Sequence, residues 1–141
     1  MILIDSNIPM YLVGAPHPRK TETQILLERL VAAGERMATD AEVLQEILQR
    51  YTAIGRRESI APAIQLTLDI VDEIYPIEKT DVLRASEIVQ SPLALAARDA
   101  IRIAVMERHG IRSILSFDSD LTNGQGCNAC IRFESRRRDS P

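Results

Sequence analysis

Met1-Ile2-Leu3-Ile4-Asp5-Ser6-Asn7 opens the chain and sets the fold that the rest can adopt. The three residues after Met1 are apolar and two of them are β-branched, a run too short for a helix core that predicts a buried strand. This strand ends at Asp5. Ligands of open α/β sheets bind beyond the carboxyl ends of the strands, so Asp5 stands where a catalytic acid is expected. Taken alone, Asp5 is explained more simply as the N-cap of a helix that starts near Asn7 or Ile8.

The composition is that of an ordinary globular domain. The 141 residues suit one domain with a sizeable core, and the contents of 45% hydrophobic and 26% charged residues are typical of such domains. With 20 acidic and 17 basic residues, the net charge is −3, which gives no overall electrostatic attraction for nucleic acid. A local basic patch would still be enough for such binding.

The sequence predicts a cytoplasmic protein that does not enter the membrane. No apolar run approaches the roughly 20 residues of a membrane span, and the pattern of a signal peptide is not present at the N-terminus. Cys127 and Cys130 are too few for a disulfide framework. Their Cys-x-x-Cys spacing occurs in redox motifs, but the pair lies near the C-terminus and lacks further zinc ligands, so we interpret both as ordinary thiols.

Predicted strands and helices alternate along the chain. Strands are expected at residues 2–4, 36–39, 73–77 and 113–116, with an edge strand at 131–133. Helices are expected at residues 8–13, 21–34, 40–54, 60–71, 80–90 and 92–109. The alternation implies an α/β protein with a mostly parallel sheet that is covered by helices on both faces.

Three helix starts are predicted from capping signals. Thr21-x-x-Gln24 and Thr39-x-x-Glu42 have the form of a capping box. Ser91-Pro92 combines an N-cap residue with proline at the first helical position. In the proline-containing loop before the first of these helices, we interpret His17 as a solvated histidine, because no histidine or cysteine is near enough in sequence for a metal site.

Asp99 is the most informative single residue of the predicted helix 92–109. It shares a face with Arg102 and with apolar residues, namely Leu95, Ala96, Ile103 and Met106. A buried carboxylate without a partner is costly, so Asp99 must be neutralised. Its partner is either Arg102, one helical turn away, or a bound cation.

Acids gather at one edge of the predicted sheet. Asp5 and Asp118 both follow strands, and Asp99 lies on the helix before the last parallel strand. Several carboxylates in one crevice repel one another unless a cation neutralises them. Oxygen ligands without histidine or cysteine favour Mg²⁺ or Mn²⁺ over zinc. Such a site suits phosphodiester hydrolysis.

Four short motifs resemble, in order and spacing, those of the PIN-domain ribonucleases. They are Ile2-Leu3-Ile4-Asp5-Ser6-Asn7, Leu44-Gln45-Glu46-Ile47, Arg98-Asp99-Ala100 and Ile114-Leu115-Ser116-Phe117-Asp118. The similarity looks greatest to the VapC-type toxins of toxin–antitoxin pairs, and it spans residues 1–134. It implies a three-layer α/β/α sandwich with a mostly parallel central sheet, whose active site holds Mg²⁺ or Mn²⁺ on four acids and cleaves RNA.

The resemblance also assigns the site residue by residue. Glu46 depends on it most, because periodicity alone leaves this side chain facing either solvent or a polar cleft. Leu121 stands where the family often has phenylalanine, and the segment 123–130 is less typical, which leaves the pairing of the last strand open. The implied metal-binding and catalytic residues are Asp5, Glu46, Asp99 and Asp118, supported by Asn7, Ser116 and Asp120.

Partners follow from the same resemblance. A VapC-type toxin would act on RNA, form a homodimer and be blocked by an antitoxin that lies over the active-site groove, often with an arginine or lysine directed at the acids. We expect a nuclease domain at residues 1–134 and a disordered basic tail at 135–141, which includes Arg136-Arg137-Arg138.

Two alternative functions stay open. A catalytically inactive PIN domain would be an RNA-binding or protein-interaction module, although such a module has no need of clustered, mutually repelling acids. A phosphotransferase that uses Asp5 as its nucleophile would be similar to the haloacid dehalogenase family, which places a second aspartate two residues on, where this chain has Asn7.

Overall fold

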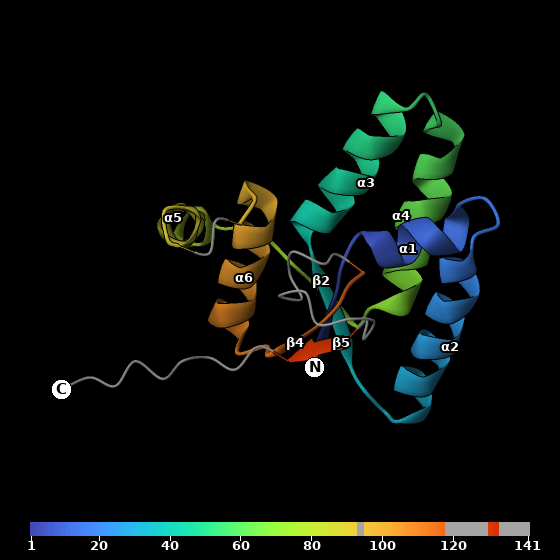
Figure 1. Cartoon of the computed structure of the whole chain (residues 1–141), viewed down its shortest axis with the longest axis horizontal. Coiled ribbons are helices and arrows are strands. Elements are labelled where there is room, and N and C mark those ends of the chain that lie inside the picture. The colour runs from blue at the N-terminus through green and yellow to red at the C-terminus, as the bar shows by residue number, and fades with distance from the viewer. Residues whose placement is uncertain (93–94, 118–129, 133–141) are drawn as a thin grey trace.

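A five-stranded sheet forms the centre of the molecule (Figure 1). The computed structural model describes residues 1–92, 95–117 and 130–132. The strands lie in the order β3-β2-β1-β4-β5; the first four are parallel to one another, and β5 is antiparallel to β4. Their bounds are Ile2–Ile4 for β1, Met37–Asp40 for β2, Glu73–Tyr75 for β3, Ser113–Leu115 for β4 and Cys130–Arg132 for β5.

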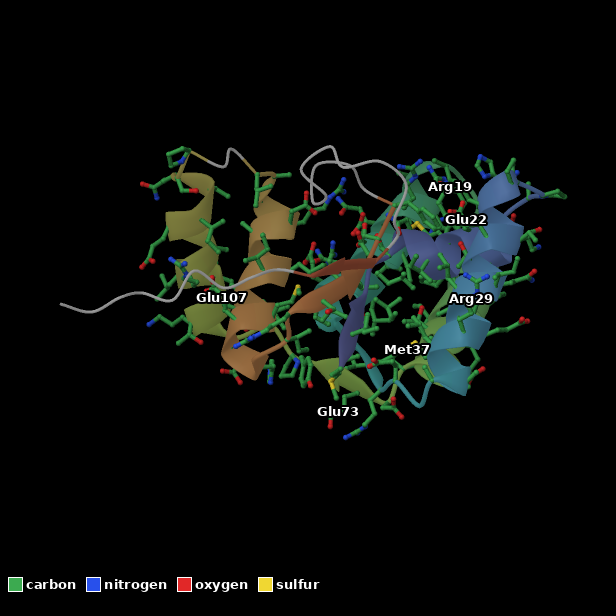
Figure 2. The ribbon with its side chains drawn as sticks, turned by 60° about the horizontal axis from the view of Figure 1, so that its bottom comes forward. Arg19, Glu22, Arg29, Met37, Glu73 and Glu107 are labelled. Carbon is green, nitrogen blue, oxygen red and sulfur yellow. The ribbon has the colours of Figure 1, made fainter. Side chains whose placement is uncertain are left out.

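Helices cover both faces of this sheet, which confirms the predicted α/β/α sandwich. In Figure 1, α5 and α6 lie on one side and α1 to α4 on the other; Figure 2 likewise places Glu107 of α6 and Arg29 of α2 on opposite sides. Within the described ranges, no helix is both long enough and apolar enough to cross a lipid bilayer. The bounds are Asn7–Val13 for α1, Pro18–Ala32 for α2, Ala41–Ala53 for α3, Ile60–Ile70 for α4, Lys79–Val89 for α5 and Ala97–His109 for α6, with a 3-10 turn at Arg57–Ser59.

The core has two halves, one on each face of the sheet. Ile2 and Ile4 of β1 pack on one face, against a cluster that includes residues of α1 and α2. Leu3 points to the other face and packs with Ile114 of β4 and Met106 of α6. Side chains alternate along a strand, so one buried strand supplies both halves. The prediction of a buried first strand is therefore confirmed.

The start of α2 differs from the prediction. Its first residue is Pro18, and the N-cap is His17, whose Nδ1 accepts a hydrogen bond from the backbone N–H of Arg19 at 3.0 Å. The predicted capping box at Thr21-x-x-Gln24 is thus wrong. Proline is favourable at a first helical position because its missing N–H would have no partner there. His17 is exposed, as expected, but it also caps the helix.

The start of α3 is displaced by one residue. The N-cap is Asp40, whose Oδ1 accepts a hydrogen bond from Val43 N–H at 3.0 Å. Thr39, the predicted cap, instead donates its Oγ–H to the carbonyl of Ile4 at 2.8 Å. This side chain joins β2 to β1 directly before Asp40 and Asp5, the acids at the strand ends.

The predicted start of α6 is also wrong. Ser91 donates its Oγ–H to the carbonyl of Ile88 at 2.6 Å, so it follows the end of α5 and is not the N-cap of α6. α6 begins at Ala97 after the N-cap Ala96, which makes no side-chain capping bond. Asp99 therefore lies in the first turn of α6, where the helix dipole favours a negative charge.

Candidate active site

Buried polar residues gather at the carboxyl ends of the three central strands. Asp5 follows β1, Asp40 ends β2 and Ser116 follows β4, and none of the three is more than 3% exposed. The register aligns Ile4 of β1 with Leu115 of β4, so the residues after these two come together. The prediction that strand ends place acids at one edge is confirmed for Asp5.

Asp5 is held in a fixed orientation by hydrogen bonds. Its Oδ1 accepts from Ser6 N–H at 2.7 Å, and its Oδ2 accepts from the hydroxyl of Ser116 at 2.5 Å. Asn7 donates its side-chain N–H to Ser116 Oγ at 3.3 Å and accepts from Phe117 N–H at 3.4 Å. Asn7 and Ser116 thus lie where residues that orient Asp5 would be; their part in catalysis stays a prediction.

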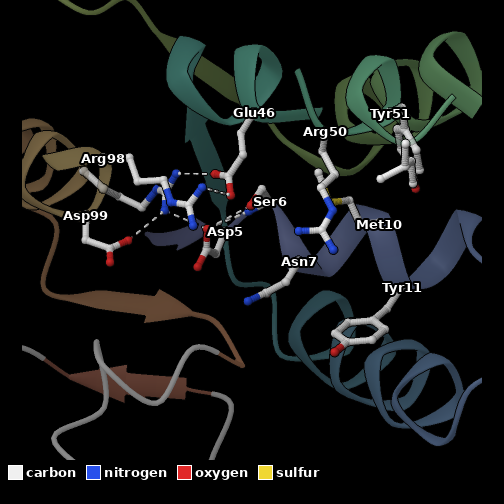
Figure 3. Close-up of a pocket in the computed structure, with 12 residues that line it drawn as sticks. Asp5, Ser6, Asn7, Met10, Tyr11, Glu46, Arg50, Tyr51, Arg98 and Asp99 are labelled. Carbon is white, nitrogen blue, oxygen red and sulfur yellow. Dashed lines mark hydrogen bonds and ion pairs between the residues drawn. The ribbon is translucent and has the colours of Figure 1, made fainter. Parts of the chain in front are cut away.

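Glu46 and Asp99 reach the same place from two helices. Figure 3 shows both side chains directed toward the region of Asp5. The Glu46 side chain of α3 is 18% exposed and lies 3.4 Å from Arg98, so of its two possible environments it occupies the polar cleft. The Asp99 side chain of α6 is only 5% exposed. Two helices and β1 therefore bring three of the four predicted acids together.

Arg102 of α6 lies among these acids. Its side chain is 1% exposed, and its Nη1 lies 2.7 Å from Asp5 and 3.7 Å from Asp99. Its Nη2 lies 3.4 Å from Glu46, and its Nε lies 4.0 Å from Asp40. The predicted pairing of Asp99 with Arg102 is present, but the shortest of these contacts goes to Asp5. One guanidinium thus faces four carboxylates within the described residues.

The electrostatics of this cluster are unbalanced. Burial raises the pKa of the Asp40 carboxyl, although the charge of Arg102 acts in the opposite direction. Burial alone would lower the pKa of Arg102, but the surrounding charges of Asp5, Asp40 and Glu46 raise it above its ordinary value. Arg102 therefore stays cationic. Negative groups outnumber it, so the cluster retains an attraction for further positive charge.

A pocket of about 410 Å³ opens over these groups. Asp5, Glu46 and Asp99 lie in its wall, and Arg50 and Arg98 lie beside them (Figure 3). Arg98 is exposed, with a side chain that is 56% accessible to solvent. The remaining lining residues are Ser6, Asn7, Met10, Tyr11, Tyr51, Ile54 and Arg102. The pocket thus combines an acidic floor with arginines that can meet a phosphate.

The donors fit a divalent metal in kind, because Asp5, Glu46 and Asp99 offer the oxygen ligands that Mg²⁺ and Mn²⁺ prefer. As they stand, however, the acids, histidines and cysteines of the described residues do not form a group that could hold a metal ion. The guanidinium of Arg102 lies between the carboxylates. A metal ion that binds these carboxylates would therefore meet the guanidinium of Arg102.

Some predicted residues lie outside the described part of the chain. They are Asp118, Asp120, Leu121, Cys127, the tail 135–141 and the side chain of Cys130. The sequence left open how the last strand pairs. In the structure β5 pairs with β4 in the antiparallel direction, with Ile114 opposite Ile131.

The sequence does not predict two features of this cluster. One is Asp40, and the other is the set of contacts that Arg102 makes besides its pairing with Asp99. A signal for Asp40 was present, since Met37-Ala38-Thr39-Asp40 is an apolar-rich strand that ends in an acid, as the first strand does. The capping-box pattern of residues 39–42 accounts for Asp40 without a role in the site. Arg102 had a weaker signal, since it shares a largely apolar helix face with Asp99, and its contacts with other elements leave no local pattern.

Comparison with known proteins gives the family. The family model for the PIN domain matches residues 2–125. Ribonuclease VapC13 of Mycobacterium tuberculosis is 57% identical over 118 residues, which cover 84% of this chain and 90% of that protein. Ribonuclease VapC23 of the same species is 34% identical over 123 residues, which cover 87% and 97%.

Solved structures share the fold. The crystal structure of M. tuberculosis VapC20, described as a sarcin-ricin loop cleaving toxin, superposes with a TM-score of 0.72 at 20% identity, covering 89% of this chain and 95% of that one. A toxin–antitoxin complex from Klebsiella pneumoniae contains a chain with a TM-score of 0.61 at 17% identity, covering 92% and 94%. With its family match and its VapC relatives, the chain belongs to the PIN-domain family, among the VapC ribonucleases.

Proposed function

We propose that this protein is a Mg²⁺- or Mn²⁺-dependent endoribonuclease that hydrolyses RNA phosphodiester bonds as the toxin of a toxin–antitoxin pair. The observation that carries the proposal is the convergence of Asp5, Glu46 and Asp99, from a strand and two helices, on one pocket. The curated relatives at 57% and 34% identity are named ribonucleases, which supports the same chemistry here.

The acids would hold the metal. Asp5, Glu46 and Asp99 are the described candidates, and Asp118 is the predicted fourth. When bound, the ion would polarise the phosphoryl group and lower the pKa of a water molecule. The hydrogen bonds from Ser6 and Ser116 keep Asp5 in one orientation, so its lone pairs point in a constant direction.

The arginines of the pocket would position the substrate. Arg50 and Arg98 line the same opening as the acids. A guanidinium donates two parallel N–H groups that match the oxygens of a phosphate. We expect these side chains to hold backbone phosphates that flank the scissile bond. Because such contacts carry no base information, the choice of RNA depends on other features of the surface.

An antitoxin would cover this pocket. The neighbour from K. pneumoniae is a toxin–antitoxin complex, which supports a protein partner of this kind. A basic antitoxin side chain that enters the acidic pocket would block both metal and RNA. The homodimer and the cytoplasmic location are proposed on the resemblance to VapC-type toxins.

The alternative of an inactive PIN module is favoured by one observation. Arg102 already neutralises part of the acid cluster, so the cluster tolerates the absence of metal. Such a module would bind RNA or protein without cleaving it. The phosphotransferase hypothesis gains no such support, because both carboxylate oxygens of Asp5 are engaged by neighbouring groups and Asn7 remains in place of the second aspartate.

The test is cleavage of total cellular RNA by the purified protein. With Mg²⁺ or Mn²⁺ we expect discrete fragments that are not formed with EDTA or by the Asp5→Asn variant. Cleavage that persists in EDTA would contradict metal dependence. If the folded protein neither cleaves RNA nor binds Mn²⁺, the inactive module is the better description; Mn²⁺ binding without cleavage would indicate a narrower substrate.

A further inference from the structure

Arg102 contacts every described candidate metal ligand. One nitrogen, Nη1, lies 2.7 Å from Asp5 Oδ1 and 3.7 Å from Asp99 Oδ1. The other, Nη2, lies 3.4 Å from Glu46 Oε2. Among the described side chains that are less than 2% exposed, Arg102 has the largest volume. The guanidinium thus occupies the space between carboxylates that a shared cation would also need.

The position of Arg102 is explained better by attraction between charges than by hydrogen bonds. Buried arginines usually satisfy their N–H groups, often by a two-pronged contact with one carboxylate. Arg102 instead divides its two terminal nitrogens among three carboxylates. Its Nε has no hydrogen-bond partner among the described residues, and neither has Asp40 Oδ2, which lies 4.0 Å away. An arginine that is held mainly by its charge can be displaced by another cation, because that cation offers the carboxylates the same attraction.

A divalent ion and the guanidinium make incompatible demands on Asp5. Mg²⁺ approaches its oxygen ligands to about 2.1 Å, well inside the ion-pair distance of an arginine. Both cations would also repel each other at such short range. Ser6 and Ser116 fix the Asp5 carboxylate, so this carboxylate cannot turn to serve both at once. The flexible partner is the arginine side chain.

We infer that Arg102 is a resident counter-ion that competes with the divalent metal for Asp5, Glu46 and Asp99, so that metal loading requires its guanidinium to withdraw. The inference rests on the proposed metal-dependent function. In the metal-free protein, Arg102 neutralises acids that would otherwise destabilise the fold. In the loaded protein, it is displaced toward the remaining acid, Asp40, or the pocket opening. Metal affinity is then lower than the carboxylates alone would give.

The test compares Mn²⁺ binding by the full-length wild type and the Arg102→Gln variant, with free Mn²⁺ measured by electron paramagnetic resonance. Removal of the competitor should tighten Mn²⁺ binding by roughly 10- to 100-fold, the range by which groups around a metal site alter its affinity. Arg108→Gln is the matched control, because Arg108 lies on the same helix but pairs with Asp81. It should leave Mn²⁺ affinity unchanged.

Thermal unfolding separates competition from a purely structural role. Without metal, Arg102→Gln should unfold at a lower temperature than the wild type, and saturating Mn²⁺ should raise its Tm by more than it raises that of the wild type. A structural arginine would lower the Tm without tightening metal binding. If Arg102→Gln does not fold, Arg102→Lys, whose compact ammonium has a shorter reach, is titrated instead and should also bind Mn²⁺ more tightly than the wild type.

The outcomes are distinguishable. Equal or weaker Mn²⁺ binding by the folded Arg102 variant overturns competition but leaves the metal-dependent nuclease intact. If neither the wild type nor the variant binds Mn²⁺, the proposed metal dependence itself falls, together with this inference.

Discussion

Arg102 and Arg108 lie on the same helix and pair with carboxylates in opposite ways. Arg108 donates from Nε and Nη2 to the two oxygens of Asp81, at 2.8 and 2.9 Å, and its side chain is 27% exposed. Arg102, at 1% exposure, meets four acids, most of them at longer range. Among the described residues, Arg108 thus has one close two-pronged partner and only one further carboxylate, the exposed Glu78 at 3.5 Å, whereas the carboxylates around Arg102 outnumber it four to one.

The carboxyl pKa values reflect this contrast. The hydrogen bonds from Arg108 hold the pKa of Asp81 below its ordinary value. Burial raises the pKa of Asp40, and the nearby charge of Asp5 adds to that effect while Arg102 opposes it. A matched pair stabilises the fold by itself. A cluster in which carboxylates outnumber cations is stabilised by an added cation, as is expected of a metal site.

The largest expected difference between the two regions is in RNA cleavage. Asp99→Asn should lower cleavage by roughly 1000-fold, because loss of a metal ligand removes several kcal/mol of transition-state stabilisation. Asp81→Asn should leave cleavage unchanged when both variants are assayed well below their unfolding temperatures. Single-turnover rates with Mn²⁺ measure both. Equal losses in the two variants would remove the distinction between the sites.

The next largest effect is on stability without metal. Arg102→Ala leaves several buried carboxylates without their cation, and we expect it to lower the free energy of unfolding by about 3–5 kcal/mol in EDTA. Urea denaturation measures this loss. Combining the change with Asp5→Asn should restore part of the stability, because one uncompensated charge is removed. Strictly additive losses would contradict the central position of Arg102.

A smaller effect concerns the pH dependence that Asp81 contributes. Its folded-state pKa lies below the ordinary value of 3.8, so its stabilisation is present above that pH and is lost as the pH falls through the folded-state pKa. Asp81→Asn should cost about 1–2 kcal/mol at neutral pH and should remove this acid-dependent loss. Urea unfolding at a series of pH values from neutral to about 3 provides the comparison. An unchanged profile would show that Asp81 is not stabilised by Arg108.

The smallest effect is expected at a surface arginine. Arg84 pairs with Glu87 at 2.7 Å, but the Glu87 side chain is 67% exposed. Solvent and salt screen such a pair, so Glu87→Gln should change stability by no more than about 0.5 kcal/mol. If Glu87→Gln lowered the free energy of unfolding as much as Asp81→Asn does, the strength of these arginine pairs would not depend on their burial.

The sheet was predictable from sequence because short apolar runs between loops and helices leave few alternatives. Ile2-Leu3-Ile4 could only be a buried strand, and parallel topology then placed Asp5 at the edge of the sheet where ligands of such folds bind. Glu46 was undecided, because helical periodicity shows which residues avoid the core but cannot tell solvent from a polar pocket.

Helix starts were harder, because several polar residues near each start can cap. Thr39 and Asp40 are adjacent, and cross-strand bonding to Ile4 engages the threonine, which leaves the aspartate as the cap. His17 is an unusual N-cap that Pro18 makes possible. The cluster around Arg102 joins three segments that are distant in sequence, so no local pattern could show it.

The pairing of β1 with β4 has a consequence for how the protein is made. Synthesis proceeds from the N-terminus, and a domain generally folds as one unit. Asp5 leaves the ribosome long before Ser116 and Arg102, which orient and neutralise it and which lie directly after β4 and in α6. The pocket is therefore incomplete until α6 and β4 have been synthesised. A nascent chain of this protein would be unable to attack the RNA around it until the domain is almost finished.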